Sequence, residues 1–457
     1  MKKLLIINLF FWIPFLIIAQ TSHITGVVKT VKKAGTVPEK KGTMISLYVI
    51  SDGANELVDT TRLLDNGLFA IGTTVKKDGF YVIGIGEVNR PTYVLPVYLK
   101  PNDRVEVGIT DNVIEFTGNP SPENKIVERW RNLTYPVSNV LNYNAFRDTY
   151  KTYLVDFEAL AGKSDDFKKS IKTPNQKFNH LMNELVSFDL DLFALCYMTM
   201  PANLHATKPE SFPAYFEKMV VPNRFPNDDV LSTMNGQQLI VLYTENAAKN
   251  EASIDKRLTF LSTGRQKSIY LYLRVARRTK VYEKYKEMME KYGKYFVIPE
   301  HKKYVTDLGE TLSKIRSSAK APNFICPDQF GKSISLSDFI GKVVLIDIWA
   351  TWCGPCKEEI PSLIKLEEEM HGSNIVFISL SVDEAKDKSK WLQMLKDMNL
   401  GGIQLFAGGW GKETKDYNVS SIPRFIVIDK QGNIVTVDGP RPSSSELKRL
   451  LQAEIAK

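Results

Sequence analysis

Two cysteines in the last third of the chain, Cys353 and Cys356, have the spacing of a redox-active dithiol. They follow residues 343–350 (VVLIDIWA), an apolar run of strand length, and precede apolar residues at helical spacing. Because Pro355 is tolerated in the first turn of a helix, Cys353 is predicted at a helix N-terminus. There, unpaired N–H groups and the helix dipole lower a thiol pKa from about 8.5 to between about 3.5 and 7.5. A Cys353 thiolate can then attack a disulfide, and Cys356 can resolve the mixed disulfide.

Two carboxylates are candidates for accepting the proton that Cys356 must lose. Asp347 interrupts the apolar run 343–350, and a lone carboxylate there is costly unless it serves a purpose. Burial raises a carboxyl pKa toward neutrality, which suits a proton acceptor. Glu359, three residues after Cys356, is the second candidate; the alternative for this residue is a solvent-exposed helix position. The sequence alone does not decide which of the two carboxylates accepts the proton.

Residues 321–457 resemble the thioredoxin superfamily, and within it the membrane-facing thiol-disulfide oxidoreductases of the TlpA and ResA type. The matching positions are Asp347, Trp352, Cys353, Cys356, Glu359, Pro361 and Pro423 within Ser421-Ile422-Pro423. The resemblance implies that Cys353 is the nucleophile and Cys356 the resolving cysteine. It also implies that Asp347 is buried and that Glu359 is an active-site glutamate. Pro423 would be a cis-proline that faces the dithiol.

The resemblance further implies how a substrate is held. The substrate-binding residues would be Trp352, Gly354, Pro355, Ile422 and Pro423. The backbone beside the proline would pair with the substrate chain as strands do. Apart from the redox-active disulfide Cys353–Cys356, neither a cofactor nor a metal is expected.

The direction of the reaction is inferred from the two residues between the cysteines. Gly354-Pro355 is the dipeptide of thioredoxin, a reductant near about −270 mV, whereas the oxidant DsbA lies near about −120 mV. A protein disulfide reductase is therefore favoured. A disulfide isomerase or oxidase stays open, as does a binding or sensing protein in which residues 21–318 hold a ligand and the thioredoxin-like domain is accessory.

The expected partners are disulfide-containing exported proteins and, as the resemblance implies, a membrane-bound electron donor. Nucleic acid is not expected, because the formal charge of +8 includes Lys2 and Lys3 and the rest is spread over 457 residues. The basic cluster at residues 274–280 is interpreted as a solvated helix face. The oligomeric state is left open.

The first residues have the pattern of a secretory signal. Met1-Lys2-Lys3 is followed by an apolar stretch to Ala19, so residues 1–20 are predicted to be a signal peptide that is cleaved after export. An uncleaved membrane anchor is the alternative. In both cases the protein is expected in the periplasm or cell envelope.

The chain is predicted to be multidomain, with an N-terminal antiparallel β domain, a middle all-α region and a C-terminal α/β thioredoxin-like domain. Residues 21–120 contain short β-like runs separated by turn residues, and they resemble the β-rich N-terminal domain of Bacteroidetes-type secreted proteins. Residues 121–318 have apolar stripes at helical spacing, one of which contains Phe178, Met182 and Leu185. Residues 319–457 alternate β and α patterns.

Two further cysteines lie outside the predicted active site. Cys196 belongs to an apolar helical stripe and Cys326 to the entrance of the C-terminal domain, so each is interpreted as a small buried apolar residue. A bridge between them is the alternative in an oxidising compartment.

Overall fold

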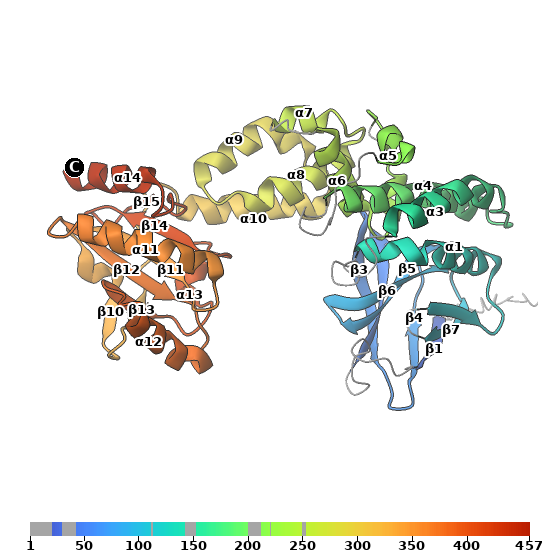
Figure 1. The fold of residues 1–457 in the computed structure, drawn as a ribbon, viewed down its shortest axis with the longest axis horizontal. Helices are drawn as coiled ribbons and strands as arrows, with labels where there is room; N and C mark the ends of the chain where they lie inside the picture. Colours follow the sequence, from blue (N-terminus) through green and yellow to red (C-terminus); the bar gives the residue numbers. More distant parts are fainter. Residues whose placement is uncertain are drawn as a thin grey trace, which may run out of the picture. The chain divides into compact units, whose positions relative to one another are not determined.

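The computed structural model describes residues 21–29, 43–110, 113–141, 152–199, 212–219, 221–248 and 253–457 (Figure 1). The chain divides into two compact units, Met1–Gln266 and Lys267–Lys457. Strands come first, then helices, then an α/β domain, which confirms the predicted multidomain fold class. The predicted signal peptide, residues 1–20, lies outside the described residues. No helix in the described ranges combines the length and the apolar character that crossing a bilayer requires.

Strands near the start of the first unit form two sheets around a common core. Their orders are β4-β1-β7-β8 and β3-β2-β5-β6. The strands are β1 (Ser22–Lys29), β2 (Met44–Ser51), β3 (Ala54–Arg62), β4 (Leu68–Thr73), β5 (Gly79–Glu87), β6 (Arg90–Leu99), β7 (Arg104–Thr110) and β8 (Val113–Thr117). Buried residues from both sheets, such as Ile24 and Val97, belong to one core cluster, as in a sandwich.

One pairing in this sandwich departs from the predicted antiparallel arrangement. β1 pairs with β7 in parallel, with His23 opposite Arg104, whereas its other neighbour β4 is antiparallel. The chain passes through the other sheet between β1 and β7, and this long connection is what a parallel pair requires.

Helices follow the sandwich in the first unit. They are α1 (Pro122–Ser138), η1 (Asn139–Leu141), α3 (Tyr153–Lys169), α4 (Gln176–Thr199), α5 (Ala214–Met219), η3 (Asp229–Ser232), α6 (Gly236–Ala247) and α7 (Ile254–Leu258). In α4 the predicted stripe of Phe178, Met182 and Leu185 is buried. Asn124 of α1 exchanges hydrogen bonds with both backbone groups of Tyr98, at 2.8 and 3.0 Å, so α1 covers the edge strand β6.

The second unit begins with helices, two of which, α9 and α10, contribute to the core of the α/β domain. α8 (Gly264–Arg274) spans the division between the units and is followed by η4 (Ala276–Arg278), α9 (Tyr282–Tyr292), η5 (Gly293–Tyr295) and α10 (Pro299–Lys314). Leu308 and Leu312 of α10 lie in the same buried cluster as Ile348. The boundary predicted between residues 318 and 319 therefore falls inside this unit.

The α/β domain is built on a sheet of order β13-β12-β11-β14-β15. Its main elements are β11 (Val343–Trp349), α11 (Gly354–Glu369), β12 (Ile375–Ser381), α12 (Lys388–Asp397), β13 (Ile403–Phe406), α13 (Lys412–Lys415), β14 (Arg424–Ile428), β15 (Ile434–Thr436) and α14 (Ser445–Ala456). A small hairpin, β9 (Ile325–Pro327) with β10 (Ser333–Ser335), and the short helix η6 (Leu336–Phe339) precede β11. A second short helix, η7 (Ala385–Asp387), lies between β12 and α12. β11, β12 and β13 are parallel, so their carboxyl ends meet at one sheet edge.

Candidate active site

The structure places Cys353 at the start of α11. β11 is buried along its whole length, and four residues after Trp349 the chain reaches Cys353, the N-cap of the helix. Pro355 lies in the first turn, where its missing N–H leaves no hydrogen bond unmade. The Sγ of Cys353 accepts a hydrogen bond from the N–H of Cys356 at 3.1 Å, in the manner of a capping side chain. The N–H of Cys356 is thus directed at the sulfur of Cys353.

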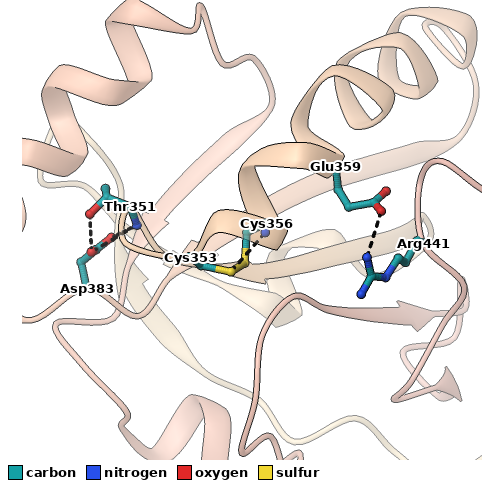
Figure 2. The surroundings of a disulfide bond; sticks show 6 residues. All are labelled: Thr351, Cys353, Cys356, Glu359, Asp383 and Arg441. Carbon is teal, nitrogen blue, oxygen red and sulfur yellow. Dashed lines mark hydrogen bonds and ion pairs between the residues drawn. A yellow bond between two sulfur atoms is a disulfide. The ribbon is translucent and has the colours of Figure 1, made fainter. Parts of the chain in front are cut away.

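Cys353 and Cys356 form a disulfide with Cα atoms 5.3 Å apart (Figure 2). The pair is therefore in its oxidised form. Only 4% of Cys353 and 3% of Cys356 is exposed. A reactant must therefore make close contact with the residues around the disulfide to reach either sulfur.

Asp347 is buried inside β11, with 6% of the residue exposed. Side chains alternate along a strand, so Asp347 lies on the same face as Val343 and Leu345, which pack in one cluster with Leu366 of α11. Burial, and after it the negative charge of Glu359, raises the pKa of Asp347 to about 7. Such a carboxyl can accept a proton and release it again close to neutral pH.

Glu359 is also buried, with 6% exposed, rather than at a solvent-exposed helix position. Its carboxylate accepts hydrogen bonds from the N–H and the Oγ of Ser443, both at 3.0 Å. Arg441 Nη1 adds an ion pair at 3.4 Å, which Figure 2 shows on one side of the disulfide. These donors come from the segment before α14 and hold the carboxylate of Glu359 in place.

Asp383 is a buried acid that the sequence analysis missed. It follows β12, and none of its surface is exposed. Its carboxylate accepts hydrogen bonds from the N–H of Thr351 at 3.0 Å and from Thr351 Oγ1 at 2.7 Å (Figure 2). It also accepts one from Ser381 Oγ at 2.7 Å. Asp383 therefore holds the loop between β11 and the first cysteine. The available signal was an acid at the carboxyl end of the strand that neighbours the active-site strand.

The predicted substrate-binding residues lie in two segments. Trp352, Gly354 and Pro355 are exposed around the disulfide, with 58% of Trp352 accessible. The Ile422–Pro423 peptide bond is cis, and both residues are half-buried. β14 starts at the next residue, Arg424, which pairs with Ile348 near the carboxyl end of β11. The sheet register therefore brings this loop to the edge from which the dithiol extends.

The remaining two cysteines are separate from this site. Cys196 and Cys326 are both free and buried, so the bridge considered between them is absent. Burial raises the pKa of each thiol to about 12, which keeps both protonated and unreactive near neutral pH. Among the described residues, no group of three or more His, Cys, Asp and Glu side chains is arranged to hold a metal ion.

Known proteins with similar sequences match the part of the chain that carries this geometry. Residues 316–451 match the Redoxin family. The thiol-disulfide oxidoreductase ResA of Bacillus thuringiensis subsp. konkukian is 30% identical over 139 residues, which are 30% of this chain and 79% of that protein. The thioredoxin-like protein YneN of Bacillus subtilis is 28% identical over 152 residues, 32% of this chain and 88% of that protein.

Among solved structures, a crystal structure of a candidate thiol-disulfide oxidoreductase from Bacteroides vulgatus is 37% identical. It covers 31% of this chain and 99% of that chain, with a TM-score of 0.29. The family assignment rests on the sequence matches, which cover more than two thirds of the ResA relative at 30% identity. Through its C-terminal domain, the chain belongs to the ResA-type thiol-disulfide oxidoreductases.

Proposed function

We propose that this protein reduces disulfides in exported proteins through the dithiol of Cys353 and Cys356. The observation that carries the proposal is the disulfide at the N-terminus of α11, in a domain where Asp347 has a pKa of about 7. The Gly354-Pro355 dipeptide supports the reducing direction, because thioredoxin, with the same dipeptide, is a reductant.

The first chemical step is an attack by the reduced protein on its client. The Cys353 thiolate attacks one sulfur of the client disulfide, a new S–S bond forms, and the second client sulfur leaves as a thiolate that takes a proton from water. The N–H groups at the start of α11 stabilise the attacking thiolate. The backbone at Ile422 and Pro423 pairs with the client strand, while the exposed Trp352 covers the apolar part of the client.

The second step releases the client. Cys356 loses its proton to a buried carboxylate, and its sulfur attacks the Sγ of Cys353 in the mixed disulfide. The Cys353–Cys356 disulfide forms, and the client leaves with two added electrons and one further proton. We assign the proton to Asp347, because the pKa of this group is about 7. Glu359 is held by Ser443 and Arg441, so its role is to add negative charge that raises the pKa of Asp347.

The oxidised protein must then be reduced again. The electron source that fits is a membrane-bound dithiol donor, because an oxidising compartment outside the cytoplasm has no reducing thiol pool. The export pattern in residues 1–20 supports this location. The periplasm or cell envelope is therefore part of the proposal.

The reduction potential of the Cys353–Cys356 pair tests the direction of the reaction. Equilibration of the full-length protein with a dithiol–disulfide buffer should give a value near about −270 mV, as for thioredoxin. In a single turnover, the reduced protein should release two thiols from a disulfide peptide for each intramolecular disulfide formed. Cys353→Ser is the control and should release none.

A potential near about −120 mV would instead assign the protein to the oxidases. Refolding of a scrambled disulfide protein without net thiol release would assign it to the isomerases. Either result would contradict the proposed reductase function.

A further inference from the structure

The basic cluster at residues 274–280 ends beside the loop of the cis-proline. Lys280 donates a hydrogen bond from Nζ to Ser420 Oγ at 3.0 Å. Ser420 lies two residues before Ile422, whose bond to Pro423 is cis. The contact ties this cluster to the loop that pairs with the client in the proposed mechanism.

The segment that carries the cluster is fixed to the redox domain. Leu308 and Leu312 of α10 belong to the same core as Ile348 of β11, and Tyr282 of α9 packs against that core. The segment precedes the Redoxin match, which covers residues 316–451. These helices therefore lie outside the part of the chain that matches the Redoxin family. They place basic side chains beside the loop of the cis-proline.

The residues that surround Lys280 carry more positive charge than negative charge. Arg424, at the start of β14, forms an ion pair with Asp438 at 2.7 Å, so these two charges offset each other. Burial, followed by the positive charge of Arg424, lowers the pKa of Lys280; the negative charge of Asp438 acts in the opposite direction, and the positive charge of Arg277 lowers the pKa further. The side chains of Arg277 and Arg278 are exposed. Within the part of the chain that the structure describes, neither arginine forms an ion pair with an acid, so an approaching peptide segment meets their positive charge.

We propose that Arg277, Arg278 and Lys280 form a basic rim that selects client segments with acidic residues next to the reacting cysteine. This inference rests on the proposed function of Cys353 as the nucleophile toward a client disulfide. A client strand that pairs beside Pro423 runs close to the rim, where acidic side chains are attracted and basic ones are repelled. The rim lies where a peptide backbone docks, which favours an acidic peptide over a nucleic acid or a lipid surface.

The test compares two disulfide peptides that differ only in two residues beside the cysteine, Glu in one and Gln in the other. The full-length reduced protein should reduce the Glu peptide with the higher kcat/KM at low salt. Two variants remove charge from the rim, the single variant Lys280→Gln and the double variant Arg277→Gln with Arg278→Gln. For each charge removed, kcat/KM for the Glu peptide should fall by about twofold to fivefold. In both rim variants, kcat/KM should fall less for the Gln peptide than for the Glu peptide.

Matched controls remove charges elsewhere in the second unit, one lysine as the control for Lys280→Gln and two lysines together as the control for the arginine pair. Lys342→Gln removes a charge before β11, at the opposite sheet edge, and Lys314→Gln one at the end of α10; both lysines are exposed. These variants should keep the preference for the Glu peptide, and salt at about 0.5 M should abolish it in the wild type.

Two results would overturn the inference and leave the proposed function standing. One is equal reduction of both peptides by the wild type at low salt. The other is a preference that the rim variants keep as fully as the controls do. If the wild type reduces neither peptide, the proposed function fails, and the inference fails with it.

Discussion

Replacement of Asp347 by asparagine should stabilise the protein at alkaline pH. An unfolded aspartate ionises near 3.8, whereas the pKa of Asp347 in the folded protein is raised to about 7. Between these values the folded state binds one more proton than the unfolded state, so wild-type stability falls as the pH rises. The pKa shift, 7 − 3.8, is about 3 units. At about 1.36 kcal/mol per unit, this shift lowers the free energy of unfolding of the wild type by about 4 kcal/mol above pH 7. Asparagine does not ionise and escapes this cost.

The measurement is urea unfolding of the oxidised wild type and of Asp347→Asn between pH 4 and pH 8. The difference in the free energy of unfolding should move in favour of the variant by about 4 kcal/mol across this range. Asp397→Asn, at an exposed position at the end of α12, is the control and should give a pH profile parallel to the wild type. A constant difference between wild type and Asp347→Asn would refute the assignment of a raised pKa to Asp347.

The same variant separates a proton acceptor from a structural group. Loss of a general base typically slows a step by about 10²-fold to 10⁴-fold. Resolution of the mixed disulfide at pH 7 should therefore slow in Asp347→Asn, although the variant is the more stable protein. Stopped-flow measurement of client release from a preformed mixed disulfide gives this rate directly. A more stable variant with unchanged resolution would leave Asp347 without a role in proton transfer.

Three other substitutions test the neighbouring carboxylates. Glu359→Gln removes the charge that helps raise the pKa of Asp347, so the midpoint of the pH profile for resolution should move to lower pH; an unchanged midpoint would contradict the coupling. Asp383→Asn weakens its hydrogen bonds to Thr351 and should lower the free energy of unfolding by about 1.5–3 kcal/mol, which urea titration measures. Ser443→Ala removes one hydrogen bond to Glu359 and should cost about 1 kcal/mol in the same titration; no loss would show that this bond is dispensable.

The central part of the site could be predicted because its signals are local in sequence. The apolar run at residues 343–350 predicts a buried strand, and Pro355 predicts a helix start, so Cys353 is positioned by its immediate neighbours. The burial of Asp347 follows from its place in that run. Such a local pattern is a reliable predictor because a strand that is covered on both faces is apolar along nearly its whole length.

Three strands with little sequence signal of their own lie at sheet edges. They are β3, β8 and β13. β3 (Ala54–Arg62) is polar and largely exposed, so it lacks the apolar alternation of a half-buried strand. β8 and β13 have only 5 and 4 residues, too few for a period to be recognised. An edge strand has one neighbour and needs less apolar surface, which weakens its sequence signal.

Contacts between distant parts of the chain were also out of reach of local patterns. Asp383 meets Thr351 across 32 positions, and Glu359 meets Ser443 across 84. The docking of α9 and α10 onto the redox domain depends on which apolar faces meet, and sequence periodicity does not specify the partner. One practical consequence is that a truncation meant to isolate the redox domain should keep residues 267–457 together.

Covalent trapping tests the central claim most directly. Full-length Cys356→Ala, once reduced and mixed with a disulfide peptide, should stall after the first step with the peptide bound through Cys353. Mass spectrometry of proteolytic fragments should locate the adduct on Cys353, dithiothreitol should release it, and Cys353→Ser should form none. An adduct on Cys196 or Cys326, or no adduct with a peptide that the wild type reduces, would contradict the account.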